Sequence, residues 1–248
     1  MEVKPYKEAP GNRKEQIIQM FDSIAGRYDF LNHLLSFNQD KKWRKKLVDL
    51  ILSDLKRDGT LERDFEVIDV ATGTGDLAFG LSGNPRFRIT GLDISTEMLK
   101  IASKKAKKRQ SPVSFVPGDS ESLPFKDHTF DIATVAFGVR NFENLQKGLR
   151  EIVRVLKNHG KLYILEFSKP RGGILSRLYG GYSDHMLPFL AGVFGGERQA
   201  YKYLPESIAN FPSGDAMLTE LEKAGSSQPE IFSLNRGVAL IYKATVIK

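Results

Sequence analysis

The residues of this chain best suited to bind a small polar ligand are a glycine-rich turn and three acids. The turn, Gly73-Thr74-Gly75-Asp76, follows the largely apolar run Val67–Val70 after two further residues. Glycine lets a backbone turn sharply and approach a ligand where a Cβ atom would collide. We therefore expect Gly73 and Gly75 to lie at a binding site, with Asp76 at the start of a helix.

The other two acids, Asp93 and Asp119, stand at the ends of the two predicted strands that follow. In an open parallel sheet the ligand lies beyond the carboxyl ends of the strands, so acids there can converge on one molecule. Asp93 suits ribose hydroxyls, and Asp119 with Ser120 suits an adenine amine. Each acid alone fits a helix cap or a turn equally well, but three in succession favour a shared ligand.

Two ligands that contain both ribose and adenine are compatible with this arrangement. The segment Gly73–Ala78 matches the G-x-G-x-x-G/A pattern of dinucleotide sites, which would make the protein an NAD(P)-dependent oxidoreductase. S-adenosylmethionine would instead place its methionine part at the glycine turn, its ribose at Asp93 and its adenine at Asp119 and Ser120. The acid at the third strand end favours S-adenosylmethionine.

Strand and helix patterns alternate around these residues, which predicts helices on both faces of a mostly parallel sheet. The last two strands form an antiparallel hairpin around Asn235-Arg236-Gly237, and this fits S-adenosylmethionine better than a dinucleotide. We expect a Rossmann-like α/β fold with seven strands, the last antiparallel, in a single domain over residues 1–248. The predicted strands are 67–70, 87–92, 113–116, 130–137, 161–167, 231–234 and 238–246, and helices are predicted at 96–108, 144–156 and 213–223.

Two amphipathic helices, predicted at 14–29 and 40–55, precede the sheet because apolar residues recur there at three- and four-residue spacings. We interpret residues 14–56 as a helical lid over a hydrophobic substrate, with Tyr28 at the site; a cap on the core is the alternative. The basic run 41–46, Arg44 included, should point largely outward. Residues 169–211, rich in glycine and aromatic residues, are predicted to form a substrate-facing insertion or else a structural loop.

Composition narrows the classes of function. The absence of cysteine excludes a disulfide framework, a thiolate metal site and a thiol nucleophile. The four histidines lack the spacing of metal ligands, so we expect no metal. Lys and Arg number 37 against 30 Asp and Glu, and the resulting net charge of +7 is compatible with an acidic partner or an anionic membrane surface.

Localisation and partners follow from the same features. We expect a cytoplasmic protein, without signal peptide or membrane span, because no stretch of about twenty apolar residues occurs. A peripheral contact with the inner face of the membrane through Lys and Arg is compatible with the charge. RNA methylation is a further alternative, but the basic residues are spread over helix faces without a stacking platform, so we expect no nucleic-acid partner. A monomer and a homo-oligomer are both compatible with the sequence.

Six segments form a recognisable set of motifs. They are Met20-Phe21-Asp22-Ser23-Ile24-Ala25-Gly26-Arg27-Tyr28-Asp29, Asp69-Val70-Ala71-Thr72-Gly73-Thr74-Gly75-Asp76, Leu123-Pro124-Phe125, Phe137-Gly138-Val139-Arg140-Asn141-Phe142, Leu165-Glu166-Phe167-Ser168 and Tyr203-Leu204-Pro205-Glu206-Ser207-Ile208. Over roughly residues 14 to 245 the chain resembles class I S-adenosylmethionine-dependent methyltransferases, specifically the ubiquinone/menaquinone biosynthesis C-methyltransferase family. The Phe-Gly-x-Arg-Asn and Tyr-Leu-Pro-Glu-Ser motifs are specific to the quinone enzymes.

The resemblance implies a substrate and a set of cofactor contacts. S-adenosylmethionine would be the methyl donor, contacted by Thr74, Asp93, Asp119 and Ser120. The acceptor would be a ring carbon of a polyprenyl quinol, with demethylmenaquinol favoured and the corresponding benzoquinol as a second acceptor.

Such a reaction requires alignment of the ring carbon and removal or polarisation of a phenolic proton. Our candidates are Arg140 and Asn141, just beyond the fourth predicted strand. Arg140 would stabilise a developing phenolate or hold a water that takes the proton, Asp76 would accept hydrogen bonds from that water, and Tyr28 would close the pocket. The alternatives are a structural ion pair for Arg140, a helix-start acid beside the cofactor ammonium for Asp76, and a core position for Tyr28.

Overall fold

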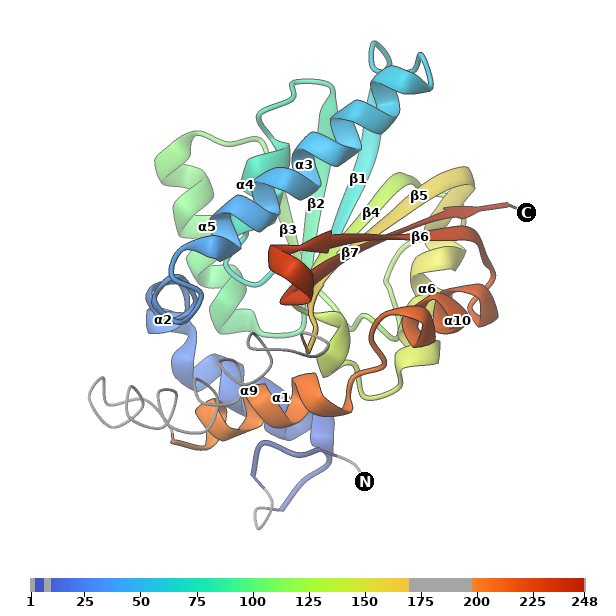
Figure 1. The fold of residues 1–248 in the computed structure, drawn as a ribbon. Coiled ribbons are helices and arrows are strands. Elements are labelled where there is room, and N and C mark those ends of the chain that lie inside the picture. The colour runs from blue at the N-terminus through green and yellow to red at the C-terminus, as the bar shows by residue number, and fades with distance from the viewer. Residues whose placement is uncertain (1–2, 7–9, 170–197, 248) are drawn as a thin grey trace.

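The computed structural model describes residues 3–6, 10–169 and 198–247, with only the backbone described for 198–202. A seven-stranded sheet in the order β3-β2-β1-β4-β5-β7-β6 runs through this part of the chain (Figure 1). Strands β1 to β5 pair in parallel, and β7 lies antiparallel between β5 and β6, which confirms the predicted fold. The strands are β1 Phe65–Val70, β2 Phe87–Asp93, β3 Ser114–Pro117, β4 Phe130–Ala136, β5 Leu156–Phe167, β6 Ser226–Leu234 and β7 Ala239–Val246.

Buried side chains alternate between the two faces of the sheet because successive residues of a strand point to opposite sides. The helices around the sheet are α3 Gln39–Arg57, α4 Asp76–Leu81, α5 Thr96–Arg109, α6 Leu145–Val155 and α10 Asp215–Lys223. Ile68 and Ala133 belong to the cluster that includes residues of α6 and α10. Their neighbours Val67 and Ile132 belong to the cluster that includes residues of α3 and α4 on the other face.

The first predicted helix is divided in two. Helix α1 spans Arg13–Ile24, and α2, Tyr28–Leu35, follows after the 3₁₀ turn Ala25–Arg27. Gly26 in this turn has a weak helix propensity, which favours the break. Tyr28 therefore begins a helix of its own and does not lie in the last turn of α1.

Helix α3 departs from the prediction at Arg44. Lys41 and Lys42 are exposed, as expected. The Arg44 side chain is only 13% exposed, its Nη1 lies 2.5 Å from Oδ2 of Asp40, and its guanidinium lies 5.5 Å from the centroid of the Phe137 ring. Arg44 therefore points inward, held by an acid one helical turn before it.

Two helices far apart in sequence lie beneath the carboxyl edge of the sheet. Helix α9, Arg198–Asn210, runs beside α1 there (Figure 1), and Ile17 and Met20 of α1 share a hydrophobic cluster with Tyr203 of α9. Part of the predicted insertion is thus helical, while its residues 170–197 lie outside the described part of the chain. Helices α1 and α9 bring side chains to the edge where the predicted site residues stand.

Candidate active site

The glycine turn between β1 and α4 has backbone angles that favour glycine. Gly73 has a φ of 57° and Gly75 a φ of 86°. A Cβ atom on Gly75 would lie 2.9 Å from the rings of both Phe79 and Phe115, so packing as well as φ requires glycine there. A Cβ atom on Gly73 would lie 3.8 Å from Cε1 of Tyr28, an ordinary contact distance.

A cavity of about 700 Å³, which we call the strand-end cavity, lies beyond the carboxyl ends of β1, β2 and β3. Gly73, Asp93, Asp119 and Ser120 all line it, so the structure brings together four of the six predicted cofactor-binding residues. Its apolar wall includes Leu92, Ile94 and Met98, together with Ile17 and Phe21 of α1.

The two acids of this cavity are held in different ways. Asp93 is only 8% exposed, and its carboxylate accepts hydrogen bonds from the backbone N–H of Gly73 at 2.7 Å and of Ser95 at 2.9 Å. Burial raises the pKa of Asp93 to about 6, although these two bonds oppose the rise. For Asp119, burial also acts to raise the pKa, but the hydrogen bond from Lys14, at 2.8 Å, helps to hold the pKa below its usual value.

Thr74 and Asp76 do not line the strand-end cavity. The Thr74 hydroxyl donates to Asp29 at 2.5 Å and accepts from Lys105 at 3.0 Å. Asp76 begins α4, as predicted, and accepts from the same Lys105 ammonium at 2.9 Å. Both side chains thus belong to a charged network outside the cavity, and a cofactor contact of Thr74 and a catalytic role of Asp76 stay predictions.

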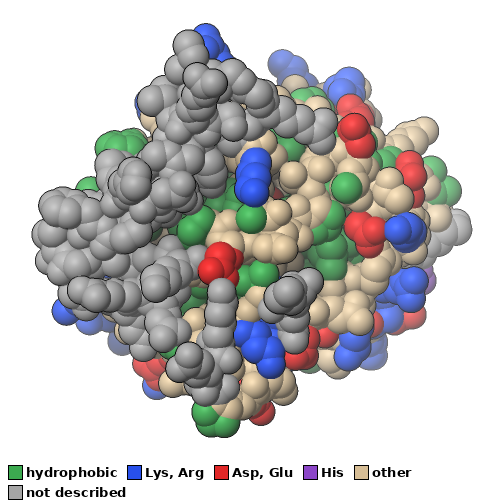
Figure 2. Space-filling model, turned by 60° about the horizontal axis from the view of Figure 1, so that its bottom comes forward, with side chains coloured by type: hydrophobic (Ala, Val, Ile, Leu, Met, Phe, Trp, Pro, Cys, Tyr) green, Lys and Arg blue, Asp and Glu red, His purple; other side chains and the backbone are tan. Residues whose placement is uncertain are grey.

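A second and larger cavity, about 1,230 Å³, lies between α2, α3 and α9; we call it the aromatic cavity. In its wall the ring centroids of Phe137 and Phe167 lie 4.5 Å apart, and the ring centroids of Trp43 and Phe167 lie 5.9 Å apart. Tyr28 and Phe137 line both cavities, so the two spaces adjoin at these residues. Figure 2 brings this end of the molecule forward and shows hydrophobic side chains at its surface among charged ones.

Arg140 lies in the wall of the aromatic cavity and forms a buried ion pair. Its Nη1 donates to Oε1 of Glu166 at 2.7 Å and to the backbone oxygen of Phe137 at 2.6 Å. Burial raises the pKa of Glu166, and the adjacent guanidinium opposes this rise. The structural ion pair that the sequence left as the alternative is therefore present, and it holds the guanidinium at the cavity.

Asn141, next to Arg140 in the sequence, lies in the wall of the strand-end cavity and not of the aromatic cavity. It belongs to the 3₁₀ turn Val139–Asn141, and its Oδ1 accepts a hydrogen bond from the hydroxyl of Tyr203 at 3.0 Å. Arg13 of α1 donates to the backbone oxygen of Arg140 at 2.8 Å. The turn is thus tied to both helices beneath the carboxyl edge.

Tyr28 lines both cavities, and its role in closing the pocket stays a prediction. Burial raises the pKa of its hydroxyl, and the same holds for Tyr203. Both phenols therefore stay protonated near neutral pH and are able to donate hydrogen bonds.

Comparison with known proteins identifies the family. The model of the ubiE/COQ5 methyltransferase family matches residues 10–246. The chain belongs to this family. It is an S-adenosylmethionine-dependent methyltransferase, and the family supports neither the NAD(P)-dependent oxidoreductase nor the RNA-methylating alternative.

Two curated relatives illustrate the similarity. The demethylmenaquinone methyltransferase of Chlorobaculum parvum is 40% identical over 232 residues, which cover 94% of this chain and 93% of the relative. The ubiquinone/menaquinone biosynthesis C-methyltransferase of Geotalea daltonii is 38% identical over 232 residues, 92% of this chain and 95% of the relative. A solved structure from Thermotoga maritima, described as an S-adenosylmethionine-dependent methyltransferase and a possible histamine N-methyltransferase, has the same fold, with a TM-score of 0.63, 17% identity and coverage of 92% and 99%.

The strand-end cavity contains the residues predicted to contact the methyl donor. Asp93 is buried there and Asp119 and Ser120 line the same cavity, while their contacts with the ribose and the adenine stay predictions. The apolar side chains of Ile94 and Met98 suit the flat faces of an adenine ring. Within the described ranges, no group of three or more Asp, Glu or His side chains is arranged to hold a metal ion, and the expectation of a metal-free enzyme stays a prediction.

Several residues at the site were not foreseen from the sequence. Glu166 lies in the motif Leu165-Glu166-Phe167-Ser168, and a lone acid in an otherwise apolar strand is a signal for a buried ion pair. Trp43 is buried in the core and also lines the aromatic cavity, and its apolar, helical spacing in the sequence indicates only the core position. The sequence gives no indication that Lys14 lies at the site, because its contact with Asp119 depends on how α1 crosses the carboxyl edge of the sheet.

Proposed function

We propose that this enzyme transfers a methyl group from S-adenosylmethionine to a ring carbon of a polyprenyl quinol, with demethylmenaquinol as the main acceptor and the benzoquinol as a second. Two adjoining cavities support this proposal, one suited to the nucleoside and one to an apolar ring. The printed names of the family relatives agree with it.

The observation that carries the proposal is a pair of buried donors without acceptors at the aromatic cavity. Nε1 of Trp43 and Nε of Arg140 have no hydrogen-bond partner among the described residues, and both side chains line the cavity. A buried N–H group without an acceptor is costly, so the cavity should bind a ligand that supplies oxygen atoms. A quinol ring is flat and apolar and carries two oxygens, which matches these requirements.

The residues at the junction can prepare such a ring for methylation. When bound, S-adenosylmethionine supplies a methyl group already activated by its sulfonium sulfur. Arg140 stabilises a phenolate oxygen, because a fixed cation in a water-poor site favours negative charge. Loss of the phenolic proton, to a water held at Arg140, raises the electron density of the ring. The ring carbon would then form a bond to the methyl carbon as the methyl–sulfur bond breaks and S-adenosylhomocysteine leaves, and the ring carbon would lose its hydrogen as a proton to water.

The walls of the cavity hold the ring in place and exclude water. Phe137 and Tyr28 stand where the two cavities adjoin, so they position the acceptor ring against the donor site. Residues 14–56 act as the lid in this proposal, since α1 covers the strand-end cavity and α2 and α3 form walls of the aromatic one. Asn141 fixes the turn that carries Arg140, through its bond to Tyr203.

The proposed substrate also places the enzyme at a membrane surface. A polyprenyl tail keeps the quinol in the bilayer, and we propose a peripheral contact at the inner face of the membrane, made from the cytoplasm. Within the described residues, no helix is long and apolar enough to cross a membrane.

An acceptor comparison tests the proposal. Purified enzyme is incubated with S-adenosylmethionine and either reduced demethylmenaquinone or the matching benzoquinol, and the products are identified by mass spectrometry. We expect methylation of the naphthoquinol at the higher kcat/KM. Methylation of neither ring, with intact S-adenosylmethionine binding, would refute the proposed acceptor class.

A further inference from the structure

Helix α2 carries apolar side chains on two opposite sides. Leu31 is buried, and Leu35 lines the aromatic cavity. On the outward side Phe30 is 53% exposed, and Phe37, just past the helix end, is 66% exposed. A surface helix normally buries one apolar face and turns polar residues to solvent. A second apolar face therefore marks an interaction surface.

Cationic residues lie beside this second face. Lys41 and Lys42 are exposed in the first turn of α3, and Arg236 is exposed in the 3₁₀ turn Asn235–Gly237. None of these three forms an ion pair with another residue in the described part of the chain. The side-chain amide of Asn235 donates to Oε1 of Gln39 at 3.2 Å, which holds the turn against the start of α3.

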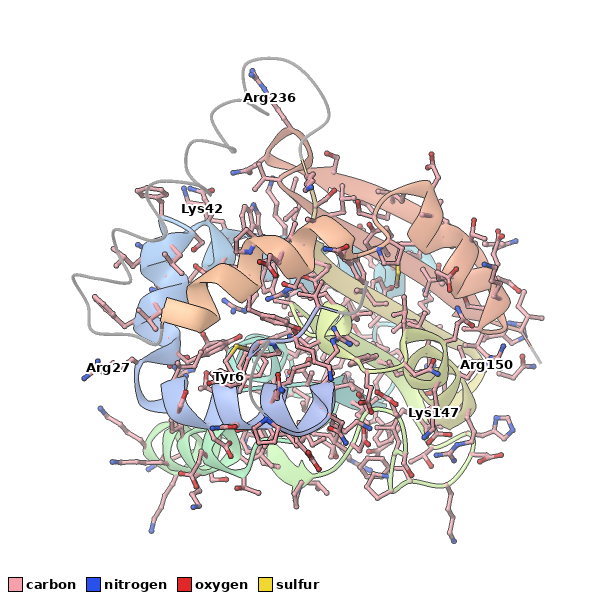
Figure 3. All side chains as sticks on the ribbon, turned by 90° about the horizontal axis from the view of Figure 1, so that it is seen from below. Tyr6, Arg27, Lys42, Lys147, Arg150 and Arg236 are labelled. Carbon is pink, nitrogen blue, oxygen red and sulfur yellow. The ribbon has the colours of Figure 1, made fainter. Side chains whose placement is uncertain are left out.

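The side-chain view from below (Figure 3) shows Lys42 and Arg236 on the same side of the molecule. Lys42 and Arg236 point away from the body along one side of the molecule, with Arg27 further along the same side, whereas Lys147 and Arg150 lie on the other side (Figure 3). We call the surface formed by Phe30, Phe37, Lys41, Lys42 and Arg236 the docking face.

The docking face is continuous with the mouth of the aromatic cavity. Phe37 belongs to both, and Asn235, next to Arg236, also lines the cavity. If the head of a lipid occupied the cavity, its tail would therefore pass out of the cavity beside exposed aromatic rings and lysines. This continuity links the surface to the site where the quinol ring is proposed to bind.

We propose that the docking face binds the surface of a bilayer that contains anionic phospholipid, so that a quinol passes from the bilayer into the aromatic cavity beside Phe37. This inference rests on the proposed quinol substrate. Phenylalanine rings suit the boundary between headgroups and acyl chains. Lysine and arginine suit anionic headgroups, and their contribution falls as salt screens the charge.

Vesicle cosedimentation tests the docking face without any catalytic readout. The full-length enzyme is mixed with phosphatidylcholine vesicles, with or without phosphatidylglycerol, at low and at high salt. We expect binding to the anionic vesicles, weakened by salt. Lys41→Gln/Lys42→Gln should reduce the partition coefficient about 30-fold, and Phe30→Ser about tenfold.

Matched controls come from another part of the surface. Lys107→Gln/Lys108→Gln removes two exposed charges from the last turn of α5, which runs back toward the amino ends of the strands. This double variant should bind vesicles as the wild type does. Phe37 is left unchanged, because it lines the aromatic cavity.

A second measurement separates failure of the docking face from failure of the proposed function. Phe30→Ser and Lys41→Gln/Lys42→Gln should keep wild-type kcat/KM on a short-tailed quinol in solution and lose activity on a long-tailed quinol in vesicles. If the wild type methylates quinols but the variants bind vesicles like the α5 control, the docking face is wrong. If no quinol is methylated, the proposed function fails while the vesicle binding still decides the docking face. A dimer in sedimentation velocity that Phe30→Ser abolishes would assign the face to a second copy and overturn the proposal.

Discussion

Nη1 of Arg140 lies 2.7 Å from Oε1 of Glu166, and the two side chains are 7% and 0% exposed. Removing one partner of such a pair leaves a buried charge uncompensated, at a cost of about 3–5 kcal/mol. Nε of the same guanidinium has no partner among the described residues. Arg140 therefore combines a structural contact with a buried Nε donor that has no partner in the described structure, in a side chain that lines the aromatic cavity, and the two features can be separated by mutation.

Arg140→Lys keeps the positive charge beside Glu166 but removes the planar guanidinium and its Nε donor. We expect kcat to fall about 100-fold, with the dissociation constant for S-adenosylmethionine within about twofold of wild type, as measured by titration calorimetry. Arg140→Ala should cut methyl transfer at least as much, but also destabilise the fold. Arg140→Ala/Glu166→Gln restores neutrality, so a double variant with normal stability and near-normal turnover would remove Arg140 from the mechanism.

Trp43→Phe removes the unpartnered indole N–H while keeping an aromatic ring in the wall of the cavity. Because that N–H has no acceptor in the described structure, the melting temperature should change little. The KM for the quinol should rise about tenfold, because the variant loses one hydrogen bond to the substrate. Trp43→Ala is the packing control and should lower stability by about 3–5 kcal/mol. An unchanged KM in Trp43→Phe would mean that the indole does not contact the acceptor.

Binding of S-adenosylmethionine should weaken at acid pH through Asp93. The pKa of this buried acid is about 6, and in our proposal the ribose hydroxyls donate to its carboxylate form. Binding should therefore be flat above about pH 6 and weaken about tenfold per pH unit below it. The pKa of Asp119 lies below its usual value, so it stays ionised in this range.

The control for this pH effect is Asp93→Asn, which should bind weakly with a flat profile. Asp69 is also buried and its pKa is also raised to about 6, but it accepts hydrogen bonds from the hydroxyls of Thr72 and Thr134. A pH dependence that persists in Asp93→Asn would assign the titration to Asp69 or another group.

Gly75→Ala tests whether this glycine serves the fold or the cofactor. Its φ of 86° and the 2.9 Å approach of Phe79 and Phe115 predict a loss of about 2–4 kcal/mol in the free energy of unfolding, without any ligand. Gly26→Ala is the matched control, since no atom of the described structure lies within 4 Å of the added Cβ. If urea unfolding gave equal stabilities for the two variants, the packing role of Gly75 would be wrong.

The sequence predicted the sheet well because its signals are local. The nearly continuous apolar runs of β1 and β4, whose residues are buried on both faces of the sheet, and the acids at or just after the ends of β2 and β3 can be recognised from neighbouring residues alone. Those two acids, Asp93 and Asp119, were predicted to lie close together because parallel strands end at the same edge of the sheet, and both line one cavity. The break at Gly26 was missed because residues 14–29 keep a helical spacing of apolar residues across it.

The contacts that the sequence did not reveal join distant segments. Arg44 belongs to a run of basic residues that is typical of a solvated helix face. It points inward because α3 packs beside Phe137. The pairing of Arg140 with Glu166 requires β4 and β5 to end side by side. The side chains of Thr74 and Asp76 belong to a network with Lys105, which lies 29 residues beyond Asp76 in the sequence.

Transfer of a labelled methyl group is the most direct test of the proposed chemistry. The purified enzyme is given S-adenosylmethionine with a deuterated methyl group and either reduced or oxidised demethylmenaquinone, and the ring product is read by mass spectrometry in a single turnover. We expect the label on a ring carbon of the quinol and none on the quinone, because only the quinol has a phenolic proton to lose. Equal labelling of both forms, or label on an oxygen atom, would contradict a reaction that proceeds through a phenolate at Arg140.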